Sequence, residues 1–435
     1  MYRKISYVVL MMLLLLSVIT PKDAYAVKGA DVSTLTTQEA FGVKYNECGI
    51  QKDMLTILKN HGITLARIRL FVSPSEPQNL AYVTALAARC KSAGMQVMLT
   101  LHYSDTWADP SAQTKPAAWK RLTQAALVTQ VYNYTKDVCS QIKPDYVQIG
   151  NETTCGMLWP NGEVCTAGNW NNYRALVTAG HQGAKDGGGA ATTTIIHVSE
   201  SSAADLKWFF DTLLQGSVSF DAIGISYYPE WHGDIANLDA INTQAESYGK
   251  PVIVCEIGDY YASGSATEDT QAQFVTDVLA VNSNAIYWEP GWVWESSVGY
   301  KALFKPISGN WQNVEMTKGL VAFGGNACGG GCTASTMHVA SIVCGTKAGS
   351  QGKKYGTATV TVQNNCGSAV SGVTVTGTFS GSYNETRSGT TNSSGQVVLT
   401  TLTQVKTPAF NFCVSNLSGT LTYRSQDNVV TCASY

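Results

Sequence analysis

Two glutamates stand at the ends of short apolar segments, and their types and places suggest acid–base chemistry. Glu152 closes the segment "DYVQIGNE" (145–152), and Glu256 follows "PVIVC" (251–255). Cleavage of a glycosidic bond needs one protonated carboxyl, which delivers a proton to the leaving oxygen, and a second ionised carboxylate. We predict that both residues are catalytic. The negative charge of Glu256 should raise the pKa of Glu152 and so keep Glu152 protonated.

Other polar and aromatic side chains end the neighbouring apolar segments. Asn151 directly precedes Glu152 and could hydrogen-bond the sugar hydroxyl next to the reacting carbon. A nearby arginine, Arg69, and a tyrosine from "ISYY" (225–228) are expected to keep Glu256 ionised. Glu200 and Glu289 also end apolar segments, so the spacing alone does not choose the pair. From these positions we take as substrate-binding candidates Arg69, His102, Asn151, Tyr227 and Trp288.

The segments that must position these residues alternate between apolar runs and helical spacing from Gly29 to Phe323. Such alternation predicts a (β/α)8 barrel, in which the carboxyl ends of the strands converge on one site. A doubly wound open sheet is the alternative, but the first run is not followed by the phosphate-binding GxGxxG turn. The eight predicted strands are 29–33, 65–71, 95–103, 145–152, 193–200, 222–229, 251–258 and 285–290.

The composition changes at "GGNACGGGCTAS" (324–335). Tryptophan is absent beyond this point, serine, threonine and glycine dominate, and the apolar residues alternate with polar ones. This pattern predicts a small all-β sandwich of the Ig-like or fibronectin-like kind over 336–435. We expect a linker over 327–335, a catalytic domain over 27–326, and a spacer or accessory role for the sandwich.

The N-terminus has the features of a secretory signal. Residues 1–26 combine a basic start, an apolar run and a small-residue "AYA" cleavage site. A retained N-terminal anchor is the alternative. We therefore predict a secreted protein that, after removal of the signal, has no membrane attachment.

Twelve cysteines fit an oxidising compartment. The spacing suggests that Cys155 pairs with Cys165, and Cys90 and Cys139 on neighbouring helices could pair as well. A zinc site at "CGGGC" (328–332) is a rival interpretation, but no histidine pair accompanies it. We predict neither a metal nor a cofactor.

The charge and the aromatic content indicate the class of partner. Only 14% of residues are charged and the net charge is −2, which argues against nucleic acid. The 21 Tyr and 10 Trp suit an uncharged ring, because aromatic faces bind such rings by stacking and apolar contact. We expect a monomer that acts on a neutral polysaccharide.

Several strings occur in an order that resembles one family. The chain is similar to the family 53 glycoside hydrolases, the arabinogalactan endo-β-1,4-galactanases, which belong to a clan of retaining barrel enzymes. The resemblance covers nearly all of 29–323. The strings are "GADVS" (29–33), "RIRLF" (67–71), "LHYSDTWADP" (101–110), "VQIGNE" (147–152), "GMLWPNG" (156–162), "ISYYPEW" (225–231) and "YWEPGW" (287–292).

The resemblance implies roles for individual residues. Glu152 would be the acid/base and Glu256 the nucleophile, and Trp288 would form the floor of the subsite for the cleaved sugar. Asp105, Trp107 and Asp109 would shape the cleft. The implied substrate is the β-1,4-galactan side chain of pectin.

The chain departs from the family pattern after the second glutamate. It reads "IGDYY" (257–261) where the family usually has a Thr-Ala-Tyr-like run. The departure concerns the outer subsites and the product pattern, not the cleavage chemistry. Some bacterial relatives carry a calcium ion in loops of this region, and we do not carry that ion over.

Two other functions compete with galactan cleavage. One is a barrel glycanase of the same clan that acts on β-mannan or a β-glucan, against which only the "HYSDTWADP" loop argues. The other is a non-catalytic glycan-binding protein, which the presence of both acids and Asn151 disfavours. Release of reducing sugar from a panel of polysaccharides distinguishes all three.

Overall fold

The computed structural model describes residues 27–74, 77–293, 299–325 and 334–435. Two compact units divide after Gly325. No helix within these ranges is both long and apolar enough to cross a membrane. The predictions for the signal segment, the CGGGC cysteines and most of the linker fall outside the described residues.

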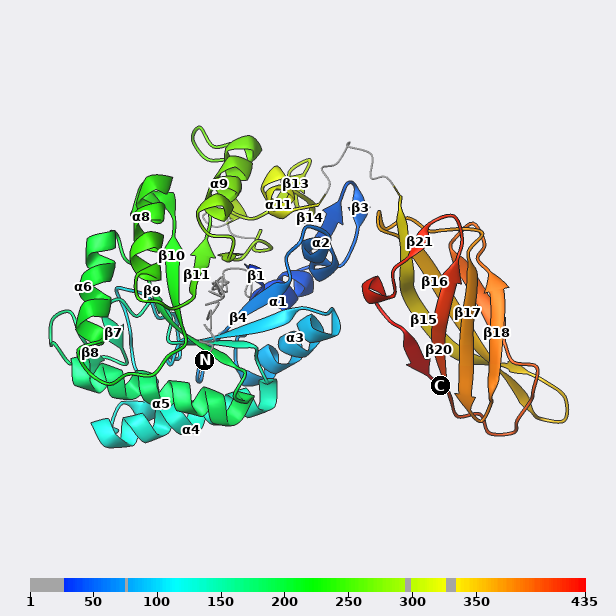
Figure 1. The fold of residues 1–435 in the computed structure, drawn as a ribbon, viewed down its shortest axis with the longest axis horizontal. Helices are drawn as coiled ribbons and strands as arrows, with labels where there is room; N and C mark the ends of the chain where they lie inside the picture. The colour runs from blue at the N-terminus through cyan, green and yellow to red at the C-terminus, as the bar shows by residue number, and fades with distance from the viewer. Residues whose placement is uncertain (1–26, 75–76, 294–298, 326–333) are drawn as a thin grey trace, which may run out of the picture. The chain divides into compact units, whose positions relative to one another are not determined.

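The first unit contains a closed barrel of eight parallel strands (Figure 1). Its strands follow the ring order β1-β12-β11-β10-β9-β6-β5-β4, which confirms the predicted (β/α)8 fold. The barrel strands are β1 (Lys28–Asp31), β4 (Leu65–Leu70), β5 (Gln96–Leu101), β6 (Tyr146–Ile149), β9 (Thr193–Val198), β10 (Ala222–Tyr227), β11 (Val252–Ile257) and β12 (Ala285–Tyr287).

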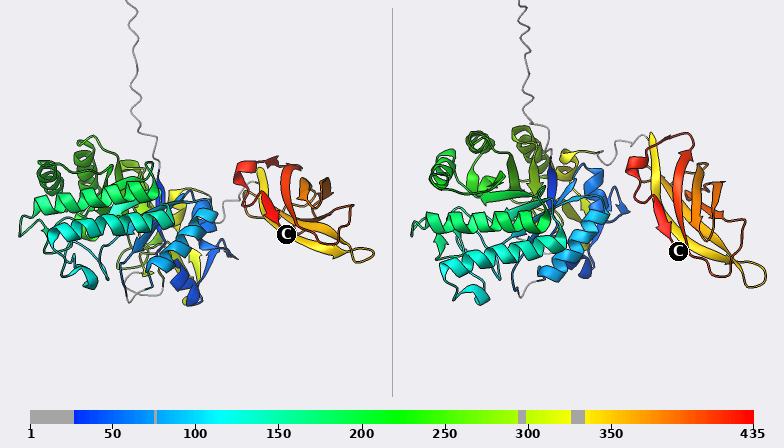
Figure 2. Two further views of the ribbon diagram at one scale, coloured as in Figure 1. Left: turned by 90° about the horizontal axis from the view of Figure 1, so that it is seen from below. Right: turned by 60° about the horizontal axis from the view of Figure 1, so that its bottom comes forward.

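Helices lie around the outside of the barrel (Figures 1 and 2). Polar side chains such as Asn79, Thr123 and Ser202 accept a hydrogen bond from a backbone N–H in the first turn and fix where helices begin. The apolar helix faces pack on the strands in one continuous core. The helices of this unit are α1 (Leu35–Ala40), α2 (Met54–Asn60), α3 (Leu80–Ser92), η1 (Ala117–Trp119), α4 (Gln124–Ile142), α5 (Trp170–Gly188), α6 (Ala203–Leu213), α7 (Pro229–His232), α8 (Ile235–Glu246), α9 (Glu268–Val281) and α11 (Lys318–Phe323).

The inside of the barrel has an apolar layer below a polar one. Side chains of a strand alternate between its two faces, so the residue two positions after an apolar one points the same way. On β4, Leu65 is followed in this way by Arg67 and Arg69. Space in the apolar layer is tight: a Cβ at Gly224 would lie 2.7 Å from the sulfur of Cys255. The apolar layer consists of Val27, Leu65, Met98, Tyr146, Ile195, Ala222, Ile253, Cys255 and Ile286.

A β-bulge in β11 redirects the last residues of that strand. Ile225 of β10 pairs with Val254, but the next residue, Ser226, pairs with Glu256. One extra residue, Cys255, therefore stands in β11 and breaks the alternation. Cys255 belongs to the apolar layer, so an unbroken alternation would turn Glu256 toward the helices. The bulge instead places it beside the polar layer.

Smaller elements decorate the barrel. A sheet in the order β13-β14-β2-β3, which the strand pattern did not predict, joins two segments that are distant in the chain. The short pair β7 and β8 lies in the loop after β6. These strands are β2 (Lys44–Glu47), β3 (Ile50–Gln51), β7 (Gly156–Met157), β8 (Gly162–Glu163), β13 (Phe304–Ile307) and β14 (Asn310–Met316).

The cysteines of the first unit match one predicted pairing and contradict the other. Cys155 and Cys165 form a disulfide across the loop after β6, as predicted. The suggested pairing of Cys90 with Cys139 is wrong, because both are buried free thiols. Each packs in the apolar core between strands and helices, where a thiol behaves as a small apolar side chain.

The second unit is a two-sheet β structure. One sheet has the order β19-β16-β15-β21 and the other β18-β17-β20-β22, and apolar residues of both form one core. A disulfide joins Cys413 to Cys432. The elements are β15 (Thr336–Ala348), β16 (Lys354–Asn364), β17 (Thr374–Gly381), β18 (Glu385–Thr390), β19 (Gln396–Thr400), β20 (Phe410–Ser418), β21 (Thr422–Tyr423), η2 (Ser425–Asp427) and β22 (Cys432–Ser434).

Candidate active site

The carboxylate of Glu256 is held by two donors at the end of β11. Arg67 donates to its Oε1 from Nη2 at 2.6 Å, and the Tyr228 hydroxyl donates to its Oε2 at 3.0 Å. Glu256 is only 6% exposed. A guanidinium in contact and a hydroxyl donor both stabilise the ionised form of a carboxyl. These contacts suit a carboxylate that must stay charged.

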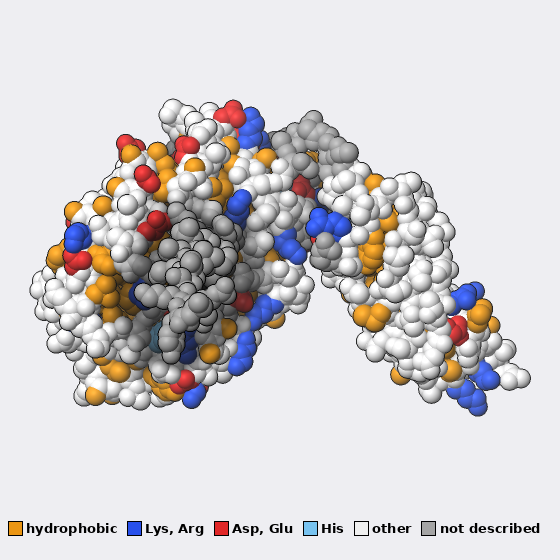
Figure 3. Space-filling view, in the orientation of Figure 1, with side chains coloured by type: hydrophobic (Ala, Val, Ile, Leu, Met, Phe, Trp, Pro, Cys, Tyr) orange, Lys and Arg blue, Asp and Glu red, His pale blue; other side chains and the backbone are white. Residues whose placement is uncertain are grey.

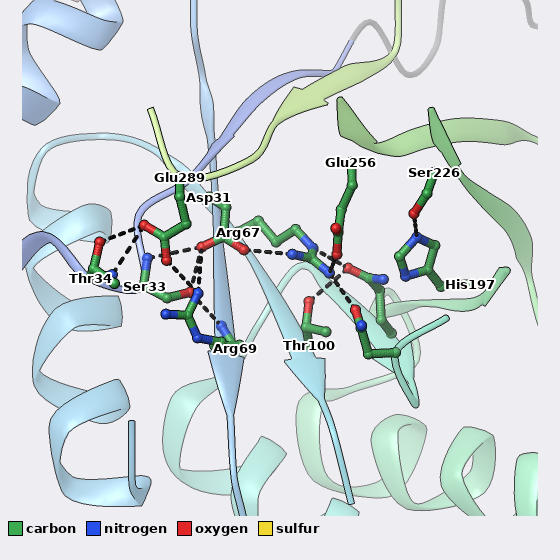
Figure 4. Close-up of polar contacts among 12 residues, drawn as sticks. Asp31, Ser33, Thr34, Arg67, Arg69, Thr100, His197, Ser226, Glu256 and Glu289 are labelled. Carbon is green, nitrogen blue, oxygen red and sulfur yellow. Dashed lines mark hydrogen bonds and ion pairs between the residues drawn. The ribbon is translucent and has the colours of Figure 1, made fainter. Parts of the chain in front are cut away.

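Arg67 is the centre of a buried polar network (Figure 4). Its Nη1 donates to Asp31 Oδ2 at 2.5 Å, and its Nε donates to Gln148 Oε1 at 2.6 Å. The same Nη2 that contacts Glu256 also donates to Asn151 Oδ1 at 2.8 Å. One rigid guanidinium thus links β1, β4, β6 and β11, and it fixes the positions of a carboxylate and an amide at once.

The sequence-based expectation that Arg69 keeps Glu256 ionised is wrong. Arg69 forms its ion pair with Glu289, and its guanidinium also lies 4.3 Å from the centroid of the Trp107 ring. Arg67 and Arg69 are two residues apart on β4, so their side chains lie on the same face of the strand, the inside of the barrel. Arg69 is one step nearer the end of the strand, and it meets the acid that follows β12 instead of the one on β11.

Both carboxylate oxygens of Glu289 are paired with neighbouring side chains. Besides the ion pair with Arg69, its Oε2 accepts from the Thr34 hydroxyl at 2.6 Å. Burial raises the pKa of Glu289 to about 7, although Arg69 opposes the shift. This acid braces the first and last strands of the barrel beside the candidate pair.

Among the residues that the structure describes, the side-chain hydrogen-bond partner of Glu152 is an uncharged hydroxyl. The Ser226 hydroxyl donates to Oε1 of Glu152 at 2.7 Å. The backbone N–H of Glu152 donates to His197 Nδ1 at 3.3 Å, so the ring proton must lie on Nε2, which is 2.9 Å from the Ser226 oxygen. The imidazole therefore donates to Ser226, and Ser226 donates to the acid. Burial, together with the charge of Arg67, lowers the pKa of His197 well below its usual value, so the ring is neutral.

The pKa of Glu152 is raised to about 8. Burial is the largest cause and the negative charge of Glu256 is the second, while the Ser226 hydrogen bond opposes them. Burial raises the pKa of Glu256 as well, but Arg67 and Tyr228 oppose that shift. Because Arg67 contacts Glu256 and the described side-chain partner of Glu152 is an uncharged hydroxyl, the shared environment favours a proton on Glu152 and a charge on Glu256.

Asn151 and His102 are immobilised at the same rim. Oδ1 of Asn151 accepts a hydrogen bond from Arg67, and Nδ2 of Asn151 donates to Ala108 O at 2.9 Å. These two contacts fix the orientation of the side-chain amide. His102 accepts from the Ala108 N–H at 3.0 Å, and burial lowers its pKa well below the usual value. Its ring lies edge-on to Trp107, with 5.9 Å between ring centroids. His102 is thus a neutral side chain that supports the loop after β5.

Asp105 and Asp109 hold this loop through the backbone. The carboxylate of Asp105 accepts from the N–H groups of Ser73 and Ala117, at 2.9 and 2.8 Å. Asp109 accepts from the N–H groups of Ser111 and Ala112, at 2.7 and 3.0 Å. Asp109 thereby closes a local turn, Asp105 joins the loop to two other segments, and Trp107 stands between them in the sequence.

Tyr227, a predicted substrate-binding residue, is directed away from the two acids. Its ring stacks on Phe274 of α9 with centroids 5.9 Å apart, and its hydroxyl donates to Gly233 O at 3.0 Å. The prediction for Tyr227 is wrong. Because side chains of a strand alternate, Ser226 and Tyr228 are the residues that face the acids.

Three tryptophans gather over the Arg69–Glu289 pair. Trp107 stacks on Trp292 with centroids 6.5 Å apart and planes 13° from parallel. The ring centroid of Trp288 lies 5.8 Å from that of Trp292 and 6.5 Å from that of Trp107. We call Trp107, Trp288 and Trp292 the tryptophan cluster. It provides an aromatic wall of the kind that binds sugar rings.

Sequence reasoning missed several residues of the polar network, although simple signals were present. The strings "GAD" and "RIR" put Asp31 and Arg67 at alternate positions of short apolar strands, where an ionic residue must have a partner. The alternation of "GISYY" likewise separates Ser226 and Tyr228 from Tyr227. The missed residues are Asp31, Arg67, Gln148, His197 and Ser226, whereas Tyr228 is the tyrosine of "ISYY" that was expected to contact Glu256.

Comparison with known proteins identifies the family. The model of glycosyl hydrolase family 53 matches residues 27–328. The chain belongs to glycosyl hydrolase family 53. It is therefore a glycoside hydrolase, and the matched segment contains the whole barrel and both glutamates.

Two relatives show how close the match is. The chain is 37% identical to arabinogalactan endo-β-1,4-galactanase A of Emericella nidulans over 328 residues, which is 67% of this chain and 92% of that protein. It is 37% identical to a probable arabinogalactan endo-β-1,4-galactanase A of Aspergillus terreus over 313 residues, covering 63% of this chain and 88% of that one.

Two solved structures share the fold. The catalytic domain of the Ignisphaera aggregans enzyme matches with a TM-score of 0.62 and 29% identity, over 68% of this chain and 95% of that one. A chain from a study of two fungal β-1,4-galactanases matches with a TM-score of 0.63 and 28% identity. The match covers 68% of this chain and 98% of that one. The family match ends where the second unit begins.

The titratable side chains of the site are arranged for proton chemistry. In the part of the chain that the structure describes, no group of three or more His, Cys, Asp and Glu side chains could hold a metal ion. Asp31, Glu152, Glu256 and Glu289 at the rim are instead paired with arginines or hydroxyls.

Proposed function

We propose that the protein is a retaining endo-β-1,4-galactanase, with Glu256 as the nucleophile and Glu152 as the acid/base. The observation that carries this assignment is the difference between their neighbours. Glu256 contacts the guanidinium of Arg67, whereas Glu152 accepts from the uncharged Ser226 hydroxyl and has its pKa raised to about 8. One acid is prepared to attack and the other to give a proton.

The two steps follow from these charges. Protonated Glu152 delivers its proton to the leaving oxygen while the Glu256 carboxylate bonds to the anomeric carbon. Glu152, now ionised, then takes a proton from water, which attacks that carbon and releases Glu256. Asn151, oriented by Arg67, donates to the hydroxyl beside the anomeric carbon. Trp288 lies under the sugar ring on the side that forms the covalent bond.

The choice of galactan rests on the relatives. The relatives from Aspergillus terreus and Emericella nidulans are named as a probable and a known arabinogalactan endo-β-1,4-galactanase A. Charged side chains are scattered over the face drawn in Figure 3, without a continuous basic or acidic area, which suits a neutral polymer. We further propose that residues 1–26 direct export, that the mature monomer begins near Val27, and that the two-sheet unit over 336–435 is an accessory domain.

A substrate panel tests the proposal. Purified protein is incubated with β-1,4-galactan, mannan, xylan and carboxymethylcellulose, and reducing ends are measured. We expect release from galactan and little from the others, with a product mixture typical of internal cleavage. Comparable activity on mannan or cellulose with none on galactan would overturn the substrate assignment and leave the two-acid mechanism intact.

Stereochemistry tests the mechanism separately. In a retaining enzyme the two catalytic carboxyl groups lie about 5–5.5 Å apart. In an inverting enzyme they lie about 6.5–9.5 Å apart, which leaves room for a water molecule between them. Proton NMR of the first product should show the same β configuration as the substrate. An initial product of α configuration would exclude the double displacement.

A further inference from the structure

An exposed tryptophan, Trp208, lies on a helix that covers the outside of the barrel. It is on α6, and 49% of it is exposed. Its ring lies edge-on to that of Trp170, the first residue of α5, with centroids 5.6 Å apart. Trp170 packs in turn against Phe209, with centroids 5.5 Å apart. The pair is therefore held by packing, while about half of one indole stays open to solvent.

A groove begins beside this pair and runs along α5. The α5 residues that line it recur every three or four positions, so they form one face of that helix. From Asn171 to Gln182 the helix rises about 16 Å. The groove has a volume of about 650 Å³, which is within the range of ligand sites, and its other walls include Tyr132 of α4 and Ser217 after α6. The lining residues of α5 are Asn171, Arg174, Ala175, Thr178, Ala179 and Gln182.

Arg174 connects the tryptophan pair to the groove. Its guanidinium lies 6.0 Å from the centroid of the Trp170 ring. Nε of Arg174 donates to Leu213 O at 2.8 Å, and Nη1 donates to Asn171 Oδ1 at 2.9 Å. The backbone of Gly216 lies against the same side chain, because a Cβ there would be 2.9 Å from Arg174 Cδ. These contacts fix one wall of the groove before any ligand binds.

The charges on this flank have partners within the protein. Lys207 and Asp211 form an ion pair. Asp186 accepts from the Tyr132 hydroxyl at 2.7 Å and from Gln182 Nε2 at 2.8 Å. With these charges satisfied, the surface offers an indole, a phenol ring, amides and hydroxyls. Such groups suit a neutral polyhydroxylated chain, whose rings stack on aromatic faces, better than they suit an anion.

We propose that the Trp170–Trp208 pair and the groove along α5 form a second binding site for the polysaccharide substrate, outside the catalytic mouth. We call it the flank site. The identity of its ligand, β-1,4-galactan, rests on the proposed function. Trp208 supplies the ring on which one sugar stacks, and the uncharged side chains of the groove hydrogen-bond the hydroxyls of further sugars.

The position of α5 links the flank site to catalysis. The helix follows the loop after β6, the strand that leads to Glu152, so it begins at the mouth end of the barrel. A galactan chain held on the flank therefore raises the effective concentration of substrate at the mouth and adds no catalytic group.

Binding can be measured without cleavage in the inactive variant Glu256→Ala. Its retardation in native gels that contain β-1,4-galactan gives an apparent Kd, and gels with mannan are the polysaccharide control. Adding Trp208→Ala should raise the Kd for galactan about tenfold, as the loss of one stacked ring implies. Retardation in mannan should be slight in both proteins.

Kinetics on long and short substrates separate the flank site from the mouth. In the otherwise wild-type protein, Trp208→Ala should raise KM for long-chain galactan about threefold and leave kcat unchanged. A p-nitrophenyl galactobioside has too few sugars to bridge mouth and flank, so its kcat/KM should stay within about twofold of wild type. A merely structural role of Trp208 would change both substrates together.

Two further variants isolate the flank site. Phe41→Ala is the matched control, since Phe41 is also 49% exposed but lies at the end of α1, and it should change neither measurement. Ala175→Gln fills the groove from α5 with another good helix former and leaves both tryptophans in place. It should weaken galactan binding in the same direction as Trp208→Ala, and it replaces that variant if Trp208→Ala loses its cooperative melting transition.

Each outcome decides a separate point. Unchanged retardation and unchanged KM in Trp208→Ala and Ala175→Gln would overturn the flank site, and so would equal losses on galactan and the galactobioside. Retardation that depends on Trp208 in mannan gels but not in galactan gels would overturn the choice of ligand. Failure of the wild-type protein to cleave galactan with retention would instead refute the proposed function, and it would be seen before any variant is made.

Discussion

The barrel mouth has a charged side and a neutral side. On the side of β1, β4 and β12, Asp31, Arg67, Arg69 and Glu289 form ion pairs below the tryptophan cluster. On the side of β9 and β10, the partners of Glu152 are a hydroxyl and a neutral imidazole. The same residue type thus contacts an arginine on one side and uncharged groups on the other. In the proposed mechanism, the position of Arg67 decides which glutamate keeps its proton.

The sharpest test of this contrast is removal of each acid in turn. Glu256→Ala should lose at least about a thousandfold in kcat/KM on every substrate, because no other group can attack the anomeric carbon. Glu152→Ala should still form the covalent intermediate from dinitrophenyl glycosides, whose leaving group needs no proton. Added azide should restore its turnover and yield the β-glycosyl azide. Azide rescue of Glu256→Ala with the same β product would reverse the two roles.

Replacing Arg67 should remove the charged side. Arg67→Met leaves the buried Asp31 and Glu256 without their cation, which should cost about 3–5 kcal/mol of folding free energy. It should lower kcat/KM about a hundredfold, and the acid limb of the pH profile should move to higher pH because the pKa of Glu256 rises. Arg69→Met is the matched control, since Arg69 contacts Glu289 and not Glu256. An equal shift of the acid limb in both variants would contradict the separate pairing.

The pH dependence of kcat/KM should report the proton on Glu152, which lies on the neutral side. Glu152 must be protonated to act as an acid, so kcat/KM should fall as the pH rises through about 8. Ser226→Ala removes a donor that favours the ionised carboxyl. Its alkaline limb should therefore move to higher pH, with only a few-fold loss at pH 6. Thr100→Val removes a hydroxyl that contacts Gln148 instead, and its limb should stay in place.

The pH dependence of folding stability should also report the proton on Glu152. The pKa of Glu152 lies near 8 in the folded state and near its usual 4.5 when unfolded, so the folded protein binds the extra proton between these values. Stability from this group is fully present below about pH 4.5 and is lost as the pH rises through 8. Glu152→Gln cannot ionise, and its Tm relative to wild type should increase from pH 5 to pH 8. A difference that is constant with pH would count against the raised pKa.

The smallest effect is expected from the second unit. It has its own apolar core, and the candidate acids all lie in the first unit. A chain that ends near Gly331 should hydrolyse soluble galactan within about twofold of the full protein, since the barrel retains its own core. The measurement is kcat/KM with a melting curve for each protein. Loss of activity in a folded, truncated protein would show that the second unit takes part in catalysis.

The local pattern of the sequence determined much of this protein. Apolar runs ending in polar residues predicted the eight strands, and the acids at two of those ends were recognisable before any coordinates. The change of composition near residue 324 separated the β-rich second unit. These features are local, since strand and helix periodicity and turn residues act over a few positions.

Only the tertiary structure decided which partners the acids have. Arg67 and Arg69 are equivalent in the sequence, and the stagger of strands around the closed barrel brings the first to Glu256 and the second to Glu289. The bulge at Cys255 turns Glu256 to the inside, against the alternation of its own strand. Register and bulges are set by the packing of neighbouring strands and by the narrow apolar layer beneath, and no short stretch of sequence contains that information.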